Sequence, residues 1–335
     1  TVAILAQVGI FRTARERVWR SARLAIPMGA SRQYAVPRAA RLCCLAFLGP
    51  ARPGSARLSD SLVEVEDGKL RGQCDGHQGV CQYLGVPYAA APIGGFRWRP
   101  PQPVFPWKGV RDAVEFKPMC LQVPFRLSRW VLQGNENCLF LNVWTPRAGC
   151  PGASCAVMFF IHGGGFIRGS GQGWNGSNLV AHAGDLVVVT INYRLGIMGF
   201  LATDELRWRD AERGSTGNYG IQDQRAALAW VQRNIHRFGG DAKNVMIFGS
   251  SAGGMSVGLH LVSQRSWPLY SKAAISSGSL SYVSVQTMAQ AERQYEDLLN
   301  VTECTEGRLA CLLNTSAEVV VNQSFKLPLR SRLYG

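Results

Sequence analysis

The chain has 335 residues, of which 47% are hydrophobic and 17% charged, a composition typical of a globular protein and not of a disordered one. Its formal net charge of +14 is concentrated at the start: residues 1–60 hold ten arginines and two carboxylates, a net of +8, which leaves +6 for residues 61–335. Because the later part has no basic block with interleaved aromatic residues, we expect no nucleic-acid partner.

Residues 1–56 form an Ala- and Arg-rich leader, which we expect to lie outside the fold. Within it, Arg38 and Arg41 precede the apolar run 42–48, and small residues follow up to Ala56. This order of basic, apolar and small segments resembles a secretory signal peptide, and an extension without regular structure is the alternative. No stretch of the sequence approaches the roughly 18–20 apolar residues of a membrane span, so we expect none.

The predicted elements begin after the leader. From about Leu62, Pro-rich turns separate short apolar runs, which predicts irregular structure that wraps the surface. The expected strands are 139–144, 156–161, 186–191, 244–248 and 272–275, and the expected helices are 219–238 and 252–263. This alternation predicts an α/β fold with a mostly parallel central sheet and helices on both faces.

One of the expected strand-to-helix junctions carries the motif G-x-S-x-G. Ser251 stands between Gly249 and Gly253, directly after the expected strand and before the expected helix. Such a sharp turn exposes the serine oxygen at the carboxyl end of the strand, where a substrate carbonyl can reach it. The setting therefore predicts a nucleophilic serine.

A second motif, H-G-G-G, occupies residues 162–165, directly after the expected strand 156–161. Backbone N–H groups without side chains in the way are what an oxyanion hole needs, so the two motifs together favour an α/β-hydrolase. In that fold the carboxylate and the histidine of the triad come after the serine, yet no histidine follows His260. We expect His260 to be a packing residue and His162 a structural part of its loop.

The cysteines and the glycosylation sequons favour an oxidising compartment. Eight of the ten cysteines lie beyond the leader in close pairs, and no pair has the C-x₂-C spacing of a zinc site, so we expect disulfides and no metal. The eight are Cys74, Cys81, Cys120, Cys138, Cys150, Cys155, Cys304 and Cys311. The glycosylation candidates in a secreted or lumenal protein are Asn175, Asn300, Asn314 and Asn322.

From Gly85 to Gly278 the chain resembles the type-B carboxylesterase and cholinesterase family. The matching segments are 85–89, 136–146, 162–166, 192–196, 217–224, 238–241 and 245–253. The resemblance implies that Ser251 is the nucleophile and that an oxyanion hole is formed by the backbone N–H groups of Gly164, Gly165 and Ala252. It also implies a disulfide from Cys120 to Cys138 and a second from Cys304 to Cys311, whereas the pairing of the other four cysteines stays open.

Two departures from the family bear on specificity. Ser250 stands where the family usually has a glutamate, which in cholinesterases helps to hold the cation of the substrate, so the resemblance does not carry choline-ester specificity. Trp130 lies near the position of the choline-stacking tryptophan, but its spacing to Cys138 differs, and we expect a packed loop aromatic.

The sequence thus predicts a serine carboxylic ester hydrolase that forms an acyl-enzyme at Ser251, acts on a small-molecule ester and uses no cofactor. We expect residues 57–335 to be a partial domain without the distal acid and histidine, so this chain alone is expected to be inactive. The alternative is a catalytically inactive adhesion or scaffold protein similar to the neuroligins. Such proteins typically lose the nucleophile, whereas Ser251 is intact here, which favours the enzyme.

Overall fold

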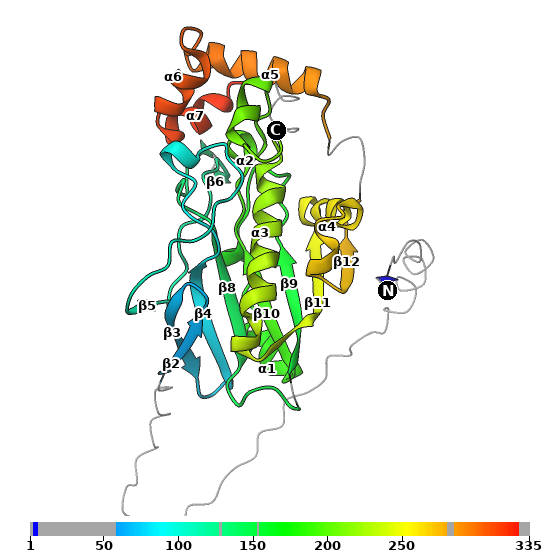
Figure 1. Ribbon diagram of the computed structural model, residues 1–335. Helices are drawn as coiled ribbons and strands as arrows, with labels where there is room; N and C mark the ends of the chain where they lie inside the picture. Colours follow the sequence, from blue (N-terminus) through cyan, green and yellow to red (C-terminus); the bar gives the residue numbers. More distant parts are fainter. Residues whose placement is uncertain (1–2, 6–57, 127–128, 153, 280–284, 328–335) are drawn as a thin grey trace, which may run out of the picture. The chain divides into compact units, whose positions relative to one another are not determined.

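The computed structural model describes residues 3–5, 58–126, 129–152, 154–279 and 285–327 (Figure 1). The described residues belong to one compact unit, and residues 6–55, with their signal-peptide-like run, lie outside the described residues. Ala3–Leu5, which fall within the expected leader, form strand β1 and pair in parallel with β12 at one edge of the sheet.

A ten-stranded mixed sheet organises this unit, in the order β1-β12-β11-β9-β10-β8-β4-β3-β2, with β5 beside β3. Its strands are β2 (Leu58–Val65), β3 (Gly68–Asp75), β4 (Val80–Pro87), β5 (Val110–Asp112), β8 (Phe140–Pro146), β9 (Cys155–Ile161), β10 (Leu186–Ile191), β11 (Gly240–Ser250) and β12 (Lys272–Ser276). The short strands β6 (Phe125–Arg126) and β7 (Arg129–Trp130) form a separate ribbon.

The sheet has a parallel half and an antiparallel half. Strands β9 to β12 pair in parallel, as the alternation of strands and helices predicted. Strands β2, β4 and β8 pair antiparallel with their neighbours, and β3 pairs antiparallel with β2 and β4 but in parallel with β5. The expectation of irregular structure after Leu62 was wrong for residues 62–87. A disulfide also joins β3 to β4, because Cys74 and Cys81 face each other in the register of the two strands.

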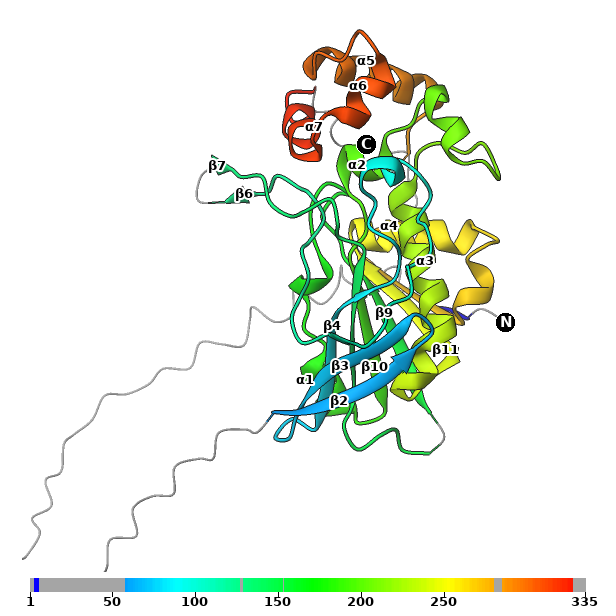
Figure 2. The same cartoon turned by 60° about the vertical axis from the view of Figure 1, so that its left-hand side comes forward.

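Helices cover both faces of the sheet, so the expected α/β fold is confirmed (Figure 2). The helices are α1 (Ser177–Ala183), α2 (Gly196–Phe200), α3 (Tyr219–Asn234), α4 (Ala252–Val262), α5 (Met288–Val301), α6 (Arg308–Asn314) and α7 (Ala317–Ser324). Alternate residues of β10 show how the faces divide: Val187 and Val189 belong to the core that contains Leu228 of α3, whereas Val188 packs with Val180 of α1.

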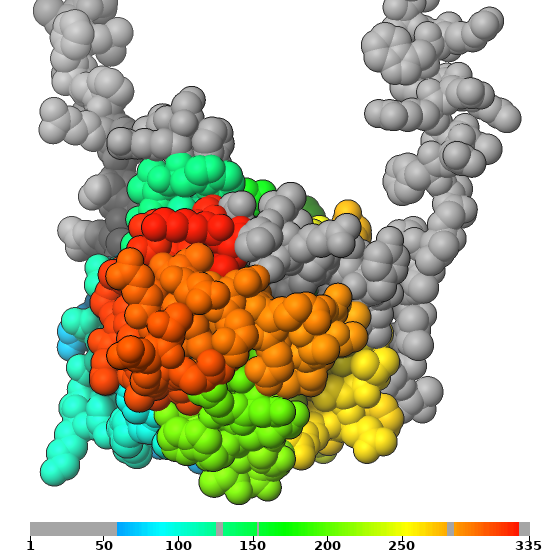
Figure 3. All heavy atoms as spheres, turned by 90° about the horizontal axis from the view of Figure 1, so that it is seen from above, coloured from blue at the N-terminus to red at the C-terminus, as the bar shows by residue number. Residues whose placement is uncertain are grey.

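A second core lies under α5, α6 and α7, which Figure 3 shows next to one another in orange and red. Tyr295 and Leu298 of α5 and Val320 of α7 pack there with Trp98 and Ile197, which come from earlier parts of the chain. The capping box of Thr287 and Gln290 fixes the start of α5. None of the helices in the described ranges is long and apolar enough to cross a membrane.

Four disulfides are formed within the described part of the chain. Two of them are Cys120–Cys138 and Cys304–Cys311, the pairs that the family resemblance implies. The four cysteines whose pairing stayed open form Cys74–Cys81 and Cys150–Cys155. Each bond joins residues that are close in sequence, so each one stabilises a local loop or hairpin and not the contact between distant segments.

Candidate active site

Ser251 occupies a sharp turn between β11 and α4. Its backbone has φ 57° and ψ −124°, a conformation that a residue with a side chain rarely adopts, and its side chain is exposed. The Ser251 N–H donates to the Ser276 carbonyl of β12 at 3.0 Å, and the Ser251 carbonyl accepts from the Met255 N–H at 2.9 Å. These two bonds hold the strained turn in place and leave the hydroxyl at the carboxyl end of the strand.

The turn is possible only because its neighbours come unusually close. A Cβ atom added to Gly253 would overlap the Ile161 carbonyl oxygen at the end of β9 and lie 3.0 Å from the His162 carbonyl oxygen. The start of α4 is therefore packed directly against the backbone that leads into the H-G-G-G loop. The spacing G-x-S-x-G is a requirement of this packing as well as of the turn.

The loop after β9 lies against Ser251. A Cβ atom on Gly163 would be 3.2 Å from the Ser251 Cβ, and the next residue, Gly164, has φ 117°, where any side chain would overlap the Arg168 carbonyl. Within the described part of the chain, the N–H groups of Gly164, Gly165 and Ala252 donate no hydrogen bond. Ala252 is the first residue of α4, so its free N–H also points along the positive end of the helix dipole.

Side chains from other segments brace this loop. Gln122 makes two hydrogen bonds to the Gly169 backbone, one to its carbonyl and one from its N–H, each 2.9 Å long. The Tyr193 hydroxyl donates to the His162 carbonyl at 2.8 Å, and Phe166 packs edge-on against Phe200. Gln122 lies between the bonded Cys120 and Cys138, so that disulfide loop supports the H-G-G-G loop. No sequence motif predicts the role of Gln122.

A buried ion pair joins the end of β10 to α3. The Arg194 guanidinium donates to both carboxylate oxygens of Asp223, at 2.8 and 2.7 Å, and the Arg194 N–H donates to the same carboxylate. Asp223 has no exposed surface. Both residues belong to segments that resemble the family, 192–196 and 217–224. Their bidentate pair joins these two segments and fixes the backbone next to Tyr193.

Neither histidine near the motifs reaches Ser251. His162 is buried, stacks on the Tyr193 ring at 4.3 Å and has its Nδ1 2.8 Å from the Gly163 carbonyl, and burial lowers its pKa to about 4. His260 is also buried, between Ser266 Oγ at 2.9 Å and Gln224 Oε1 at 3.0 Å, and burial lowers its pKa to about 4. Both imidazoles are therefore neutral structural groups.

The three other histidines, His77, His182 and His236, are exposed. Within the described residues, the Ser251 hydroxyl has no hydrogen bond to an imidazole or a carboxylate. The H-G-G-G loop thus lies against the predicted nucleophile, and among the described residues no base is hydrogen-bonded to it.

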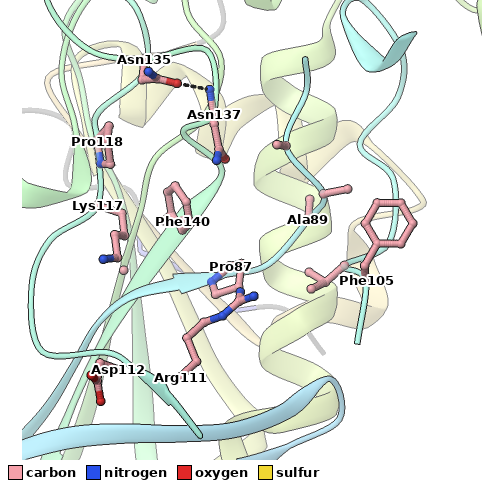
Figure 4. Close-up of a pocket in the computed structure, with 14 residues that line it drawn as sticks. Pro87, Ala89, Phe105, Arg111, Asp112, Lys117, Pro118, Asn135, Asn137 and Phe140 are labelled. Carbon is pink, nitrogen blue, oxygen red and sulfur yellow. Dashed lines mark hydrogen bonds between the residues drawn. The ribbon is translucent and has the colours of Figure 1, made fainter. Parts of the chain in front are cut away.

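A pocket of about 680 Å³ lies elsewhere, beside β4 and the start of β8 (Figure 4). Pro87, Ala89, Lys117 and Phe140 are among the residues that line it, and Ser251 is not. Reaction at Ser251 cannot occur in this pocket, so we do not assign the ester to it.

Comparisons with known proteins find relatives in sequence and in structure. The family model described as "Carboxylesterase family" matches residues 59–333. The rat protein "Pyrethroid hydrolase Ces2e" is 39% identical over 79% of this chain and 46% of its own length. The mouse "Acylcarnitine hydrolase" is 40% identical over 67% of this chain and 39% of its own length. The chain thus spans less than half the length of these relatives.

Solved structures give the same picture. A carboxylesterase from Geobacillus stearothermophilus, EST55, superposes with a TM-score of 0.72 at 38% identity and covers 82% of this chain and 56% of its own. A structure titled "PNB esterase" superposes with a TM-score of 0.71 at 35% identity, over 81% of this chain and 54% of its own. The likeness extends over nearly all of the described residues beyond the leader.

Proposed function

The chain belongs to the carboxylesterase family, and on that premise we propose that it carries the nucleophile half of a serine carboxylic ester hydrolase. The observation that supports this most strongly is the turn at Ser251. A serine held at φ 57° between a strand and a helix, with three unbonded N–H groups near it, is costly to form and is typical of an acylated nucleophile.

The proposed first step is attack on the ester. The Ser251 oxygen bonds to the carbonyl carbon while its proton passes to a general base, and the C–O bond to the alcohol then breaks as the alcohol takes up that proton. The carbonyl oxygen becomes an oxyanion in between. Gly164, Gly165 and Ala252 stabilise its charge through their N–H groups, each of which contributes about 10²–10³ in rate.

The second step releases the acid. Water attacks the acyl-serine with help from the same base, and Ser251 takes its proton back. The base is a histidine oriented by a carboxylate, and we propose that both are supplied from outside the 335 residues. The reasons are that no histidine follows His260 and that His162 and His260 are buried and engaged.

We propose that the protein works in the secretory pathway or outside the cell. Four disulfides in the described part of the chain are what an oxidising compartment permits. Asn175, Asn300, Asn314 and Asn322 remain the candidate glycosylation sites.

The proposal is tested by supplying the missing half. Residues 59–333 are joined to the part of the rat relative that the alignment leaves uncovered, and hydrolysis of a 4-nitrophenyl ester is measured. We expect turnover, and a loss in kcat of about 10⁶ for Ser251→Ala, as when the nucleophile of a serine protease is removed. The matched control is Ser250→Ala, which should stay within about tenfold of the parent because Ser250 contacts no proposed reacting group. A parent that folds but stays inactive would favour the adhesion alternative.

A further inference from the structure

A second pocket, of about 780 Å³, lies on the outer side of α3 and contains neither Ser251 nor the H-G-G-G loop. Four segments form it: residues 99–103, the turn 209–213, α3 and residues 265–269. Its size falls in the range of about 300–1,000 Å³ that small-molecule sites occupy.

The lining of this pocket is strongly basic. It contains five arginines, Arg99, Arg209, Arg213, Arg225 and Arg265, and two carboxylates, Asp210 and Glu212, so its formal charge is +3. We call the pocket that these five arginines line the arginine pocket. Guanidinium groups stay protonated in proteins, so this charge persists at any physiological pH.

Most of these arginines have no partner. Within the described ranges, the guanidinium groups of Arg99, Arg225 and Arg265 make no ion pair and no hydrogen bond. Arg209 is only 7% exposed; its Nη2 donates to the Gly95 and Arg97 carbonyls at 2.8 Å, while its buried Nε has no partner. The Arg99 Nε is also buried and without a partner. Unsatisfied buried donors of this kind cost free energy in the empty pocket.

The two carboxylates do not neutralise the cluster. Asp210 accepts hydrogen bonds from the hydroxyl and the N–H of Ser215, the latter at 3.3 Å. Glu212 lies 3.5 Å from Arg213, its neighbour in the chain, and both side chains are exposed. Neither carboxylate forms an ion pair with Arg99, Arg225 or Arg265, and no other carboxylate of the described residues does.

The arginines also repel one another. Burial lowers the pKa of Arg225, and the charges of Arg265 and then Arg213 lower it further. Burial likewise lowers the pKa of Arg209, with Arg99 as the next cause. The repulsion thus acts within two sets, Arg225 with Arg265 and Arg213, and Arg209 with Arg99. Such repulsion between like charges destabilises the chain, and an anion bound between them would relieve it.

The pocket of Figure 4 shows the contrast. It also has cationic side chains, but Arg111 stacks on Trp107 at 4.3 Å and Lys117 donates to Glu115 at 2.7 Å. Those cations already have partners in the chain. Only the arginine pocket, of the two, has donors in excess.

We propose that the arginine pocket binds a small molecule that carries a diphosphate group. The planar guanidinium presents paired N–H donors that match phosphate oxygens, and several arginines from different segments can hold two adjacent phosphates. The wall at Pro100, Pro101 and Pro103 is stiff, and the Gln102 side chain and backbone fix it through bonds to the Pro100 carbonyl and the Ala90 N–H. The segment that carries Arg99 is thus held in place before the ligand arrives. This site is independent of the chemistry proposed for Ser251.

The test is calorimetric titration of the 335-residue chain with inorganic pyrophosphate. We expect saturable binding at one site, weakened about 10- to 100-fold by Arg225→Gln and by Arg265→Gln, the range for a hydrogen bond to a charged group. The control is Arg237→Gln, which removes the same charge from an exposed position on the 3₁₀ turn Ile235–Phe238, outside the pocket. It should bind as the parent does.

A second arm separates a free ligand from a lipid headgroup. Vesicles of phosphatidylcholine with a diacylglycerol diphosphate are compared with phosphatidylcholine alone. Binding to the former that Arg265→Gln weakens and Arg237→Gln does not supports the same site with a membrane-borne phosphate. Circular dichroism checks the fold of each variant, and Arg265 is exposed, so its substitution does not disturb the core. Failure to bind either probe, or equal losses for Arg237→Gln and the pocket variants, would overturn the proposal.

Discussion

Expressed alone, the 335-residue chain is expected to hydrolyse 4-nitrophenyl acetate no faster than its own Ser251→Ala variant. The serine hydroxyl is a poor nucleophile until a base takes its proton, and neither nearby histidine can do so. His260 is buried and hydrogen-bonded to Ser266 and Gln224, and the His162 ring is hydrogen-bonded to the Gly163 carbonyl. Removing the base of a serine protease costs about 10⁶ in kcat, so the chain should fall about that far below its fusion with the uncovered part of the rat relative.

The measurement is a steady-state assay of both forms, with folding checked by circular dichroism. Ser251-dependent turnover by the chain alone would contradict the expectation and would point to a local base. The next variant would then be His260→Gln, because His260 is the histidine that follows the nucleophile on α4. Turnover that survived in His260→Gln would leave His162 as the base.

Gly253→Ala is expected to be severely destabilising. Alanine favours a helix over glycine by about 1 kcal/mol, so propensity alone predicts a more stable protein. Packing predicts the opposite, since the new Cβ would overlap the Ile161 carbonyl oxygen, which is backbone and cannot rotate away. We expect the free energy of unfolding to fall by about 4 kcal/mol or more, which lowers Tm by roughly 10 °C in a domain of this size.

Thermal unfolding followed by circular dichroism measures this effect. The matched control is Gly173→Ala, because a Cβ at Gly173 meets nothing within 4 Å and Gly173 does not have a positive φ. Its Tm should stay close to that of the parent. A Gly253→Ala protein as stable as the control would mean that α4 does not start against the end of β9, and the geometry at Ser251 would have to be redrawn.

The parts of the site that are local in sequence were predictable. The turn at Ser251 needs a strand, a small residue on each side and a helix, all within about a dozen residues, so the motif and its flanks define it. The H-G-G-G loop is local for the same reason. The buried strands β9 and β10 were visible as continuous apolar runs because helices cover both of their faces.

The parts that depend on distant contacts were not predictable. Strands β2 to β4 form the antiparallel half of the sheet. Their residues are a mixture of polar and apolar types, which the sequence alone does not distinguish from a loop because the partner strands are not visible in it. Gln122 is hydrogen-bonded to Gly169 beside the H-G-G-G loop from 47 residues away, and a glutamine carries no signal of that contact. The arginine pocket is lined by four segments between residues 99 and 269. Its five arginines are spread over these segments and form no basic run, so the sequence does not predict that they cluster.

The most direct test of the account is covalent labelling of Ser251. The fusion of residues 59–333 with the part of the rat relative that they leave uncovered is treated with a fluorophosphonate, digested and mapped by mass spectrometry. We predict a single phosphonate adduct on the peptide that contains Ser251, full labelling of Ser250→Ala, and no adduct on Ser251→Ala. An adduct on any other residue, or unchanged labelling of Ser251→Ala, would contradict the claim that the strained turn after β11 holds the nucleophile.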